Sequence, residues 1–121
     1  MPVVGLDRVE LARLPGRLSA DPVPSGLGED YAVRVVRVPA GPRTPHLHPH
    51  SDEVTYVVSG SGNAWEGDRC TPVGAGDLII VPRGTAHATV ATGHEDLVLL
   101  CFFPRPDLAE NLVELDAPLR T

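Results

Sequence analysis

Proline and glycine interrupt this chain so often that a long helix has no room to form. The sequence holds 13 prolines and 12 glycines, spread over its whole length. Proline lacks a backbone donor and glycine favours tight turns, so both residues end regular elements. Between them lie short apolar runs, which are typical of an all-β protein with many strands. With 121 residues, 42% of them hydrophobic, the chain can build one such core and is too short for two.

The apolar runs predict seven strands joined by polar turns. We expect the strands at residues 31–38, 44–50, 54–59, 63–66, 77–81, 87–91 and 97–103. Gly60-Ser61-Gly62 and Pro82-Arg83-Gly84 are two of the reversals between them. Short strands at this even spacing predict an antiparallel sandwich or barrel over residues 32–104.

The two ends of the chain differ from this pattern. Residues 1–31 are expected to form an arm, with a short helix or irregular segment at 6–14 and a loop rich in Pro, Gly and Ser at 18–30. After Pro106, Leu108, Leu112 and Leu115 recur at helical spacing. Residues 105–121 therefore predict a short C-terminal helix and tail.

Charge and cysteine content argue against several classes of function. There are 16 acidic and 10 basic residues, all ten of them arginine, giving a net charge of −6. Such a surface repels phosphate backbones and anionic lipid, so we expect neither nucleic acid nor membrane as a partner. The start of the chain does not resemble a signal peptide, and no apolar stretch reaches the ~20 residues that span a bilayer. We expect a cytoplasmic protein in which Cys70 and Cys101 are reduced.

Three histidines gather in the segment PHLHPH. His46 and His48 are two residues apart, so on a strand both rings point to the same face. Glu53 has the opposite parity and joins them only if a bulge or turn within 49–52 changes the register. With His87 from a distant strand, these residues form a suitable ligand set for one divalent transition metal ion. Taken alone, the segment fits an exposed loop with incidental histidines almost equally well.

Glycines and a proline frame these residues in two motifs. The first consists of Gly41, His46, His48, Glu53 and Gly60, and the second of Gly76, Pro82, Gly84 and His87. The two motifs resemble those of the cupin superfamily, and within it those of small single-domain bacterial proteins of the polyketide-cyclase-like and dioxygenase-like kinds. The resemblance implies a double-stranded β-helix, or jelly-roll, barrel that holds iron, zinc, nickel or manganese with His46, His48, Glu53 and His87. It also implies a homodimer formed through residues 1–38. Two departures are a spacing shorter by one residue after Gly41, and Ala91 where the family often has asparagine.

Other side chains near the predicted site leave alternatives open. His50 either replaces Glu53 as the fourth ligand, acts as a base beside the metal, or is a rim residue without a role. We take His50 and Glu53 as the candidate catalytic residues. Alternation along the last strand turns inward one of two sets, either Leu97, Leu99, Cys101 and Phe103 or Val98, Leu100 and Phe102. With the first set, we expect a substrate pocket lined by Thr55, Val57, Thr89, Cys101 and Phe103. Arg34 and Arg43 are candidates for contact with an acidic group of a substrate.

Three histidines and one carboxylate leave coordination positions open, as in catalytic metal sites. We therefore expect a metal-dependent enzyme that acts on a small oxygenated organic molecule. The first reaction to consider is oxygenation in bacterial secondary or aromatic metabolism. One alternative is a non-redox polyketide cyclase or isomerase that uses the metal as a Lewis acid, and another is a non-catalytic cupin that binds a metal or a small molecule.

Overall fold

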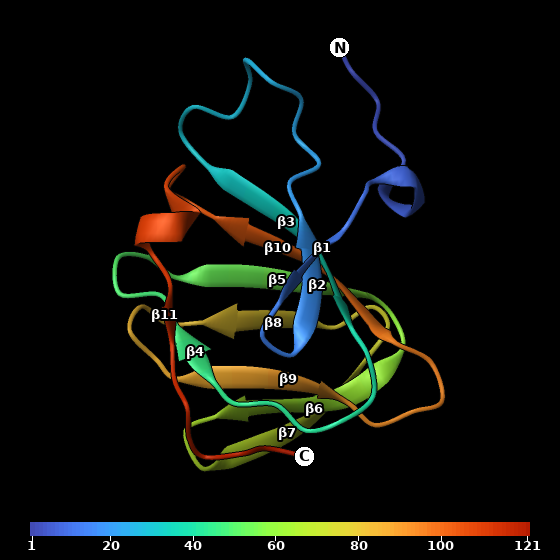
Figure 1. Ribbon diagram of the computed structural model, residues 1–121, viewed down its shortest axis with the longest axis vertical. Helices are drawn as coiled ribbons and strands as arrows, with labels where there is room; N and C mark the ends of the chain where they lie inside the picture. Colours follow the sequence, from blue (N-terminus) through green and yellow to red (C-terminus); the bar gives the residue numbers. More distant parts are fainter.

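A computed structural model describes residues 1–121 as two antiparallel sheets that face each other (Figure 1). The strand order is β1-β2-β3-β10-β5-β8 in the six-stranded sheet and β11-β4-β9-β6-β7 in the five-stranded sheet. In chain order the elements are η1 (Leu6–Arg8), β1 (Ala12–Leu14), β2 (Arg17–Ala20), β3 (Ala32–Val38), β4 (His46–Leu47), β5 (Glu53–Ser59), β6 (Ser61–Glu66), β7 (Arg69–Gly74), β8 (Leu78–Val81), β9 (His87–Ala91), β10 (Leu97–Phe103), η2 (Leu108–Glu110) and β11 (Val113–Glu114). Neither short helix is long and apolar enough to cross a membrane.

The strands at the centre of both sheets follow the sequence pattern closely. The predictions for 87–91 and 97–103 coincide with β9 and β10, and those for β3, β5, β6 and β8 agree to within two residues. The strand predicted at 44–50 shrinks to the two residues of β4. Pro45 and Pro49 flank it, and because proline has no N–H to donate, a longer paired strand is disfavoured there.

The expectation of a closed barrel is wrong, because the two sheets are not joined by hydrogen-bonded strands. Strands β1 and β8 form the edges of one sheet, and β11 and β7 form the edges of the other. No strand pairing connects an edge of one sheet with an edge of the other. The jelly-roll is therefore a sandwich with open seams.

The arm and the loop predicted before residue 32 contain a hairpin. Strand β1 pairs with β2, and β2 pairs in turn with β3, so the hairpin extends the six-stranded sheet. Only one turn of helix, η1, forms in the predicted helical segment. The hairpin is easily missed in the sequence because its strands are only three and four residues long, too short for a clear periodic pattern.

The prediction of a C-terminal helix is also wrong. One turn, η2, is followed by β11, which pairs with β4. Asn111, between these two elements, is completely buried and bonded to the loop after β4. These tertiary contacts outweigh the helical spacing of the leucines, because a helix of two or three turns is marginal on its own.

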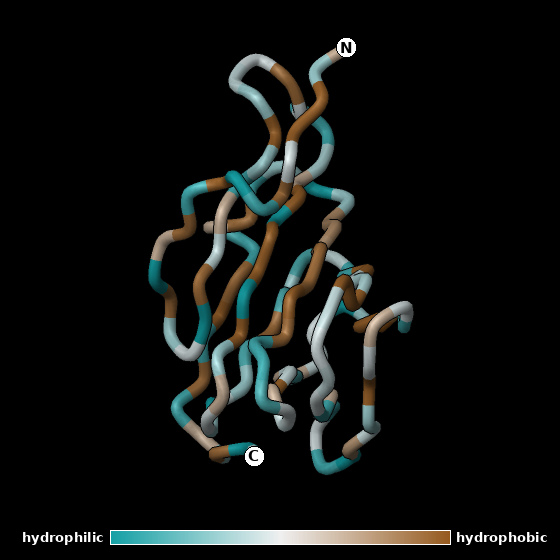
Figure 2. Tube along the Cα trace, turned by 90° about the vertical axis from the view of Figure 1, so that its right-hand side faces the viewer, coloured by the Kyte–Doolittle hydropathy of each residue, from teal (hydrophilic) through white to brown (hydrophobic).

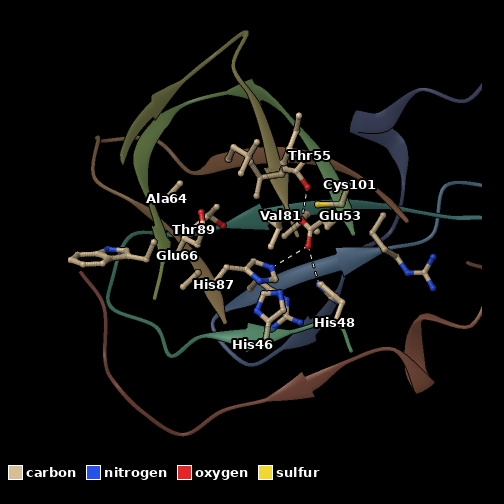
Figure 3. A pocket seen from close by; sticks show the side chains of 18 of the residues that line it. His46, His48, Glu53, Thr55, Ala64, Glu66, Val81, His87, Thr89 and Cys101 are labelled. Carbon is tan, nitrogen blue, oxygen red and sulfur yellow. Dashed lines mark hydrogen bonds and ion pairs between the residues drawn. The ribbon is translucent and has the colours of Figure 1, made fainter. Parts of the chain in front are cut away.

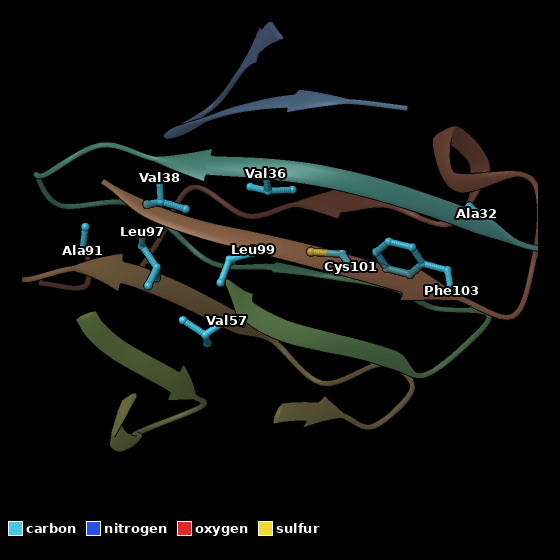
Figure 4. Packing of buried hydrophobic residues seen from close by; sticks show 9 residues of the cluster. All are labelled: Ala32, Val36, Val38, Val57, Ala91, Leu97, Leu99, Cys101 and Phe103. Atoms are coloured by element: carbon cyan, nitrogen blue, oxygen red, sulfur yellow. The ribbon is translucent and has the colours of Figure 1, made fainter. Parts of the chain in front are cut away.

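The hydrophobic core lies on the inner face of the six-stranded sheet (Figure 4). Alternate residues of β10 point inward and are buried, namely Leu97, Leu99, Cys101 and Phe103. They pack against Val36 and Val38 of β3 and Val57 of β5. Of the two sets of β10 residues that sequence leaves open, this one faces the interior.

The outer face of the same sheet is apolar as well. Tyr56 and Val58 of β5, Leu78 and Ile80 of β8, and Phe102 of β10 are all exposed there. Neighbouring strands bring them together, since Tyr56 lies opposite Leu78. The hydropathy colouring of the Cα trace shows hydrophobic stretches along several strands (Figure 2). We call this set the outer apolar face.

Gly60 makes the tight connection between β5 and β6. Its φ of 86° lies in the left-handed region that favours glycine. A Cβ atom at this position would collide with the backbone carbonyl oxygen of Asp96, at the start of β10. Glycine at this position therefore lets the chain pass from β5 in the six-stranded sheet to β6 in the five-stranded sheet, close to the backbone of Asp96.

Candidate metal centre

Four buried side chains point toward one another between the two sheets (Figure 3). His46 belongs to β4, His48 follows it, Glu53 begins β5 and His87 begins β9. One possible ligand atom from each lies within 4.8 Å of all the others. The four predicted ligands, which come from two separate stretches of the sequence, are thus neighbours in the fold.

The loop after β4 changes the register in the way that Glu53 requires. Within it, the backbone N–H of His50 donates to Oδ1 of Asn111 at 2.7 Å, and Nδ2 of Asn111 donates to the Ser51 hydroxyl at 2.8 Å. The N–H of Gly84 also donates to the carbonyl of His48 at 2.8 Å. Because these bonds hold the turn closed, β5 starts with Glu53 on the inner face.

Backbone carbonyls orient two of the rings. Nδ1 of His48 lies 2.7 Å from the carbonyl oxygen of Asn111, and Nδ1 of His87 lies 2.9 Å from that of Thr85. A carbonyl oxygen only accepts hydrogen bonds, so the proton of each neutral ring is assigned to Nδ1. The lone pair of each neutral ring is then on Nε2, which faces Glu53.

The carboxylate of Glu53 is the charged centre of the cluster. Its Oε1 lies 2.9 Å from Nε2 of His48 and 3.1 Å from Nε2 of His87, while the Thr55 hydroxyl donates to Oε2. Burial alone raises the pKa of this carboxyl, but hydrogen bonds to its oxygens, from His48 and His87 when Nε2 carries a proton and from Thr55, outweigh burial and hold the pKa well below its usual range. Glu53 is therefore ionised at neutral pH.

His46 completes the cluster as a neutral ring. Burial above all, together with the nearby charges of Arg17 and Arg43, lowers the pKa of His46 far below its usual range. Its Nδ1 is buried and makes no hydrogen bond, and Nε2 of His48 is likewise without a hydrogen bond of good geometry. Such unpaired buried nitrogens are rare, and neutral imidazole is the form that binds a metal ion.

The residues present fit a divalent first-row transition ion. Metal–ligand bonds of about 2.1 Å set neighbouring ligand atoms about 3 Å apart and opposite ones about 4.2 Å apart. The two distances from Glu53 to the histidine nitrogens are 2.9 and 3.1 Å, and the whole set lies within 4.8 Å. Lone pairs and a carboxylate oxygen that converge in this way repel one another unless positive charge lies among them. A divalent metal ion held by these residues would supply that charge.

The cluster forms part of the wall of a cavity of about 260 Å³. Four of the five predicted pocket residues line it, namely Thr55, Thr89, Cys101 and Phe103. The fifth, Val57, is fully buried in the hydrophobic core instead. Burial, followed by the charge of Glu53, raises the pKa of the Cys101 thiol well above its usual value, so this side chain is a neutral part of the wall.

His50 lies apart from the cluster. Its side chain is exposed on the loop after β4 and does not line the cavity. On an extended strand His50 would face the same side as His46 and His48, but the chain turns at Pro49 before it reaches His50. The structure thus brings Glu53, and not His50, to the other three residues.

Sequence reasoning missed several residues that the fold adds to the cavity. Leu14, Arg17 and Ser19 come from the β1–β2 hairpin, and Leu112 comes from the C-terminal segment. Arg17 is buried and paired with Glu114 of β11 at 2.8 Å. Nothing in the local sequence marks these residues, because their position depends on strand pairings that were not predicted.

Solved structures with the same fold include several enzymes. The chain is 26% identical to the polyketide cyclase RemF from Streptomyces resistomycificus, with a TM-score of 0.72 over 100% of this chain and 84% of that one. It is 20% identical to the nucleoside dehydratase Pac13, with a TM-score of 0.74 over 95% of this chain and 91% of that one. A predicted oxalate decarboxylase from Thermotoga maritima, also 20% identical, has a TM-score of 0.75 over 86% of this chain and 99% of that one.

Family membership follows from the sequence itself. No curated protein sequence matches the chain at a significant level. The model of the Cupin domain family matches residues 34–103, which is more than half of the chain and includes all four residues of the cluster. The protein belongs to the cupin superfamily.

Proposed function

We propose that this cupin is a metal-dependent enzyme that rearranges a small oxygenated organic molecule without net oxidation, as a cyclase or isomerase does. One observation carries the proposal: a buried set of three imidazoles and a carboxylate opens onto a largely apolar cavity of about 260 Å³. Such cavities, with a few converging polar groups, are typical of sites for small organic ligands.

The residues of the site have separable roles in this proposal. His46, His48, Glu53 and His87 would hold the ion. A divalent ion bound there would supply Lewis acidity toward a carbonyl or enol oxygen of the substrate. Val36, Leu99 and Phe103 enclose the apolar body of the substrate and exclude water. The Thr55 hydroxyl fixes the orientation of the Glu53 carboxylate.

Two observations favour different reactions. Cyclisation is supported by the likeness to RemF, which extends over the whole of this chain. The dehydratase Pac13, another enzyme of similar fold, is also named for a reaction without net oxidation. Oxygenation is the second candidate, since three histidines and one carboxylate are also a suitable ligand set for iron(II).

Metal analysis of the purified protein tests the first step. We expect one equivalent of a transition metal in the wild type, less than a tenth of that in His87→Ala and Glu53→Gln, and an unchanged content in His50→Ala. His94→Ala is the matched control, because His94 is exposed in a turn far along the chain from the cluster. Wild-type protein that takes up no zinc, iron, nickel or manganese after dialysis and reloading overturns the proposal.

The reaction itself is tested with chelating substrates in an oxygen electrode. A panel of 1,3-diketones, aromatic polyketones and catechols is offered to the metal-loaded protein, and products are followed by mass spectrometry. A product of unchanged or dehydrated mass without oxygen uptake supports a cyclase or isomerase. Stoichiometric oxygen uptake with a mass gain supports the oxygenase. Tight binding without any product supports the non-catalytic alternative.

The homodimer expected from the resemblance remains a proposal, and we assign its interface to the outer apolar face instead of to residues 1–38. This face is built from three neighbouring strands, β10, β5 and β8, at a spacing of about 4.8 Å, and covers roughly 14 by 20 Å. A standard interface covers about 800 Å² on each partner, so the face would be the apolar centre of a larger contact. In a symmetric dimer a second copy offers the same apolar surface in return.

A further inference from the structure

The cavity wall holds one acid–base group that the candidate metal ligands do not use. Cyclisation or isomerisation of a ketone begins with loss of a proton from the carbon next to the carbonyl group, and His50, the base expected from the sequence, lies outside the cavity. The ionisable residues of the wall are the four candidate ligands, four arginines, Cys101 and Glu66. Arginine keeps its proton, and the raised pKa of the Cys101 thiol makes it keep its proton too. Glu66 is left as the free base.

The side chain of Glu66 faces the cavity from β6. Successive residues of a strand point to opposite sides. Trp65 lies on the outer side, where its Nε1 donates to the carbonyl oxygen of Thr121 at 3.1 Å and the guanidinium of Arg120 lies 4.5 Å from the ring centroid. Ala64 and Glu66 therefore share the inner side, and both line the cavity (Figure 3).

Strand pairing sets Glu66 directly beside the metal centre, opposite His87 of β9. The N–H of Gly67 donates to the carbonyl of Ala86 at 3.0 Å, so the next pair, Glu66 and His87, is of the kind without mutual hydrogen bonds, with Cα atoms about 4.5 Å apart. The carboxylate of Glu66 is nevertheless not one of the four groups whose ligand atoms lie within 4.8 Å of one another. It stands next to the ion site without belonging to it.

No ion pair in the fold occupies this carboxylate. Glu66 is exposed and takes part in none of the salt bridges of the structure. Arg69 of β7 lies opposite it in the other pairing of β6, also on the cavity wall, and forms no ion pair with it. The free oxygens of Glu66 can therefore accept a proton from a molecule in the cavity.

We infer that Glu66 is the general base of the reaction, and that its carboxylate removes a proton from the carbon next to a carbonyl group of the substrate. The C–H bond breaks and its electron pair moves to the carbonyl oxygen, which gives an enolate. Glu66 becomes a carboxylic acid and returns the proton to a carbon or an oxygen of the product, so nothing is oxidised or reduced. The inference rests on the proposed function and narrows the substrate to a ketone with a hydrogen on the neighbouring carbon.

Deuterium uptake by 2-hydroxyacetophenone in D2O tests the inference. This probe has oxygens on adjacent carbons and a CH2 group whose protons exchange through the enolate, which proton NMR follows. We expect zinc-loaded wild type to accelerate the exchange, and Glu66→Gln to lower the accelerated rate about a hundredfold. Zinc content and probe affinity should change less than twofold. Glu95→Gln is the matched control, with an unchanged rate, because Glu95 is exposed and does not line the cavity.

Rescue by formate separates a base from a residue that only shapes the cavity. Glu66→Ala should lose the exchange as Glu66→Gln does. Added formate should restore part of the rate in Glu66→Ala, where the carboxylate of formate can take the vacated space, and none in Glu66→Gln, where the amide fills it. Equal rates with and without formate in Glu66→Ala contradict the role of a base.

Zinc content, measured in parallel, distinguishes failure of this inference from failure of the proposed function. Wild-type protein that takes up no transition metal overturns both. With zinc bound, exchange that is no faster than in buffer, or that is equal in the wild type and Glu66→Gln, overturns the inference alone. Loss of zinc from Glu66→Gln also overturns it, because Glu66 would then be a metal ligand.

Discussion

The ring of His48 and the backbone of Asn111 are joined by a hydrogen bond of 2.7 Å across 63 positions of sequence. The carbonyl oxygen of Asn111 accepts from Nδ1 of His48, which leaves Nε2 of that ring facing Glu53. The side chain of the same asparagine bonds the loop that precedes Glu53. One buried residue of the C-terminal segment thus positions two of the four candidate ligands.

Asn111→Ala should weaken both the fold and the metal site. The backbone carbonyl remains, but the backbone N–H of His50 and the Ser51 hydroxyl lose their partner. We expect the free energy of unfolding to fall by about 2–3 kcal/mol, from the lost hydrogen bonds and the cavity. Zinc affinity should fall about tenfold, as for other residues that hold metal ligands in place.

Urea denaturation and competition with a chromogenic chelator measure these two effects. Asn63→Ala is the matched control, since Asn63 is only partly buried and donates to the chain terminus at 3.3 Å. Its effect on zinc affinity should be less than twofold. Equal zinc affinity in Asn111→Ala and the wild type would contradict the role given to this residue.

Gly60→Ala should be strongly destabilising. The substitution forces a left-handed conformation on alanine and places a methyl group against the carbonyl of Asp96. We expect a loss of about 3 kcal/mol in the free energy of unfolding. Gly67→Ala, at a φ of 54° with open space around it, should lose only about 1 kcal/mol. Similar losses in the two variants would show that the contact with Asp96 is unimportant.

The two thiols should differ in reactivity. Cys70 is exposed and Cys101 is buried, and neither forms a disulfide. With an aromatic disulfide reagent at pH 8, one thiol per chain should react quickly in the native protein and the second only after unfolding. Cys70→Ser should remove the fast reaction. Two fast-reacting thiols in the wild type would be the contrary result.

The buried thiol of Cys101 makes the free energy of unfolding depend on pH in the alkaline range. The pKa of Cys101 is raised in the folded state, so above the usual thiol pKa of about 8.5 the unfolded state loses a proton that the folded state keeps. Stability from this group is complete below that pH and declines as pH rises further. Urea midpoints of the Cys70→Ser variant between pH 7.5 and 9.5 should therefore fall, and the fall should be smaller after an added Cys101→Ala substitution.

Ile80→Lys should convert the proposed dimer into a monomer. Ile80 is 63% exposed on the outer apolar face, where a buried lysine would leave an unpaired charge in the interface. Sedimentation velocity gives the oligomeric state directly. Leu119→Lys is the control, because Leu119 is 62% exposed and lies outside this face. A monomeric wild type, or a dimer that persists in Ile80→Lys, refutes the assignment.

The sequence predicts the parts of this protein that depend on local pattern. Strands β9 and β10 were predicted to the residue, because turns bound each of them on both sides. The four residues of the metal centre were predicted from motif spacing and from the need for a turn before Glu53. The family model and the structure bear out the cupin assignment.

The elements that sequence missed are stabilised by distant partners. Strand β11 exists because it pairs with β4, and β2 because it pairs with β3. The burial of Arg17 depends on the first of these pairings, since its partner Glu114 lies on β11. Within residues 108–115 the local pattern shows only leucines at helical spacing, and this is why a helix was wrongly predicted there.

The part of the chain that matches the family model and the parts on either side of it contribute different residues to the site, and this affects how the protein can evolve. Residues 34–103, which match the family model, contain the four candidate ligands, while Leu14, Arg17, Ser19, Leu108 and Leu112 of the cavity wall lie in the flanks on either side. Substitutions, or exchange of the flanks, can therefore reshape what enters the chamber and leave the ion-binding strands untouched. Part of the cavity wall and all four candidate ligands thus occupy different stretches of one short polypeptide, so that part of the wall can change independently of the ligands.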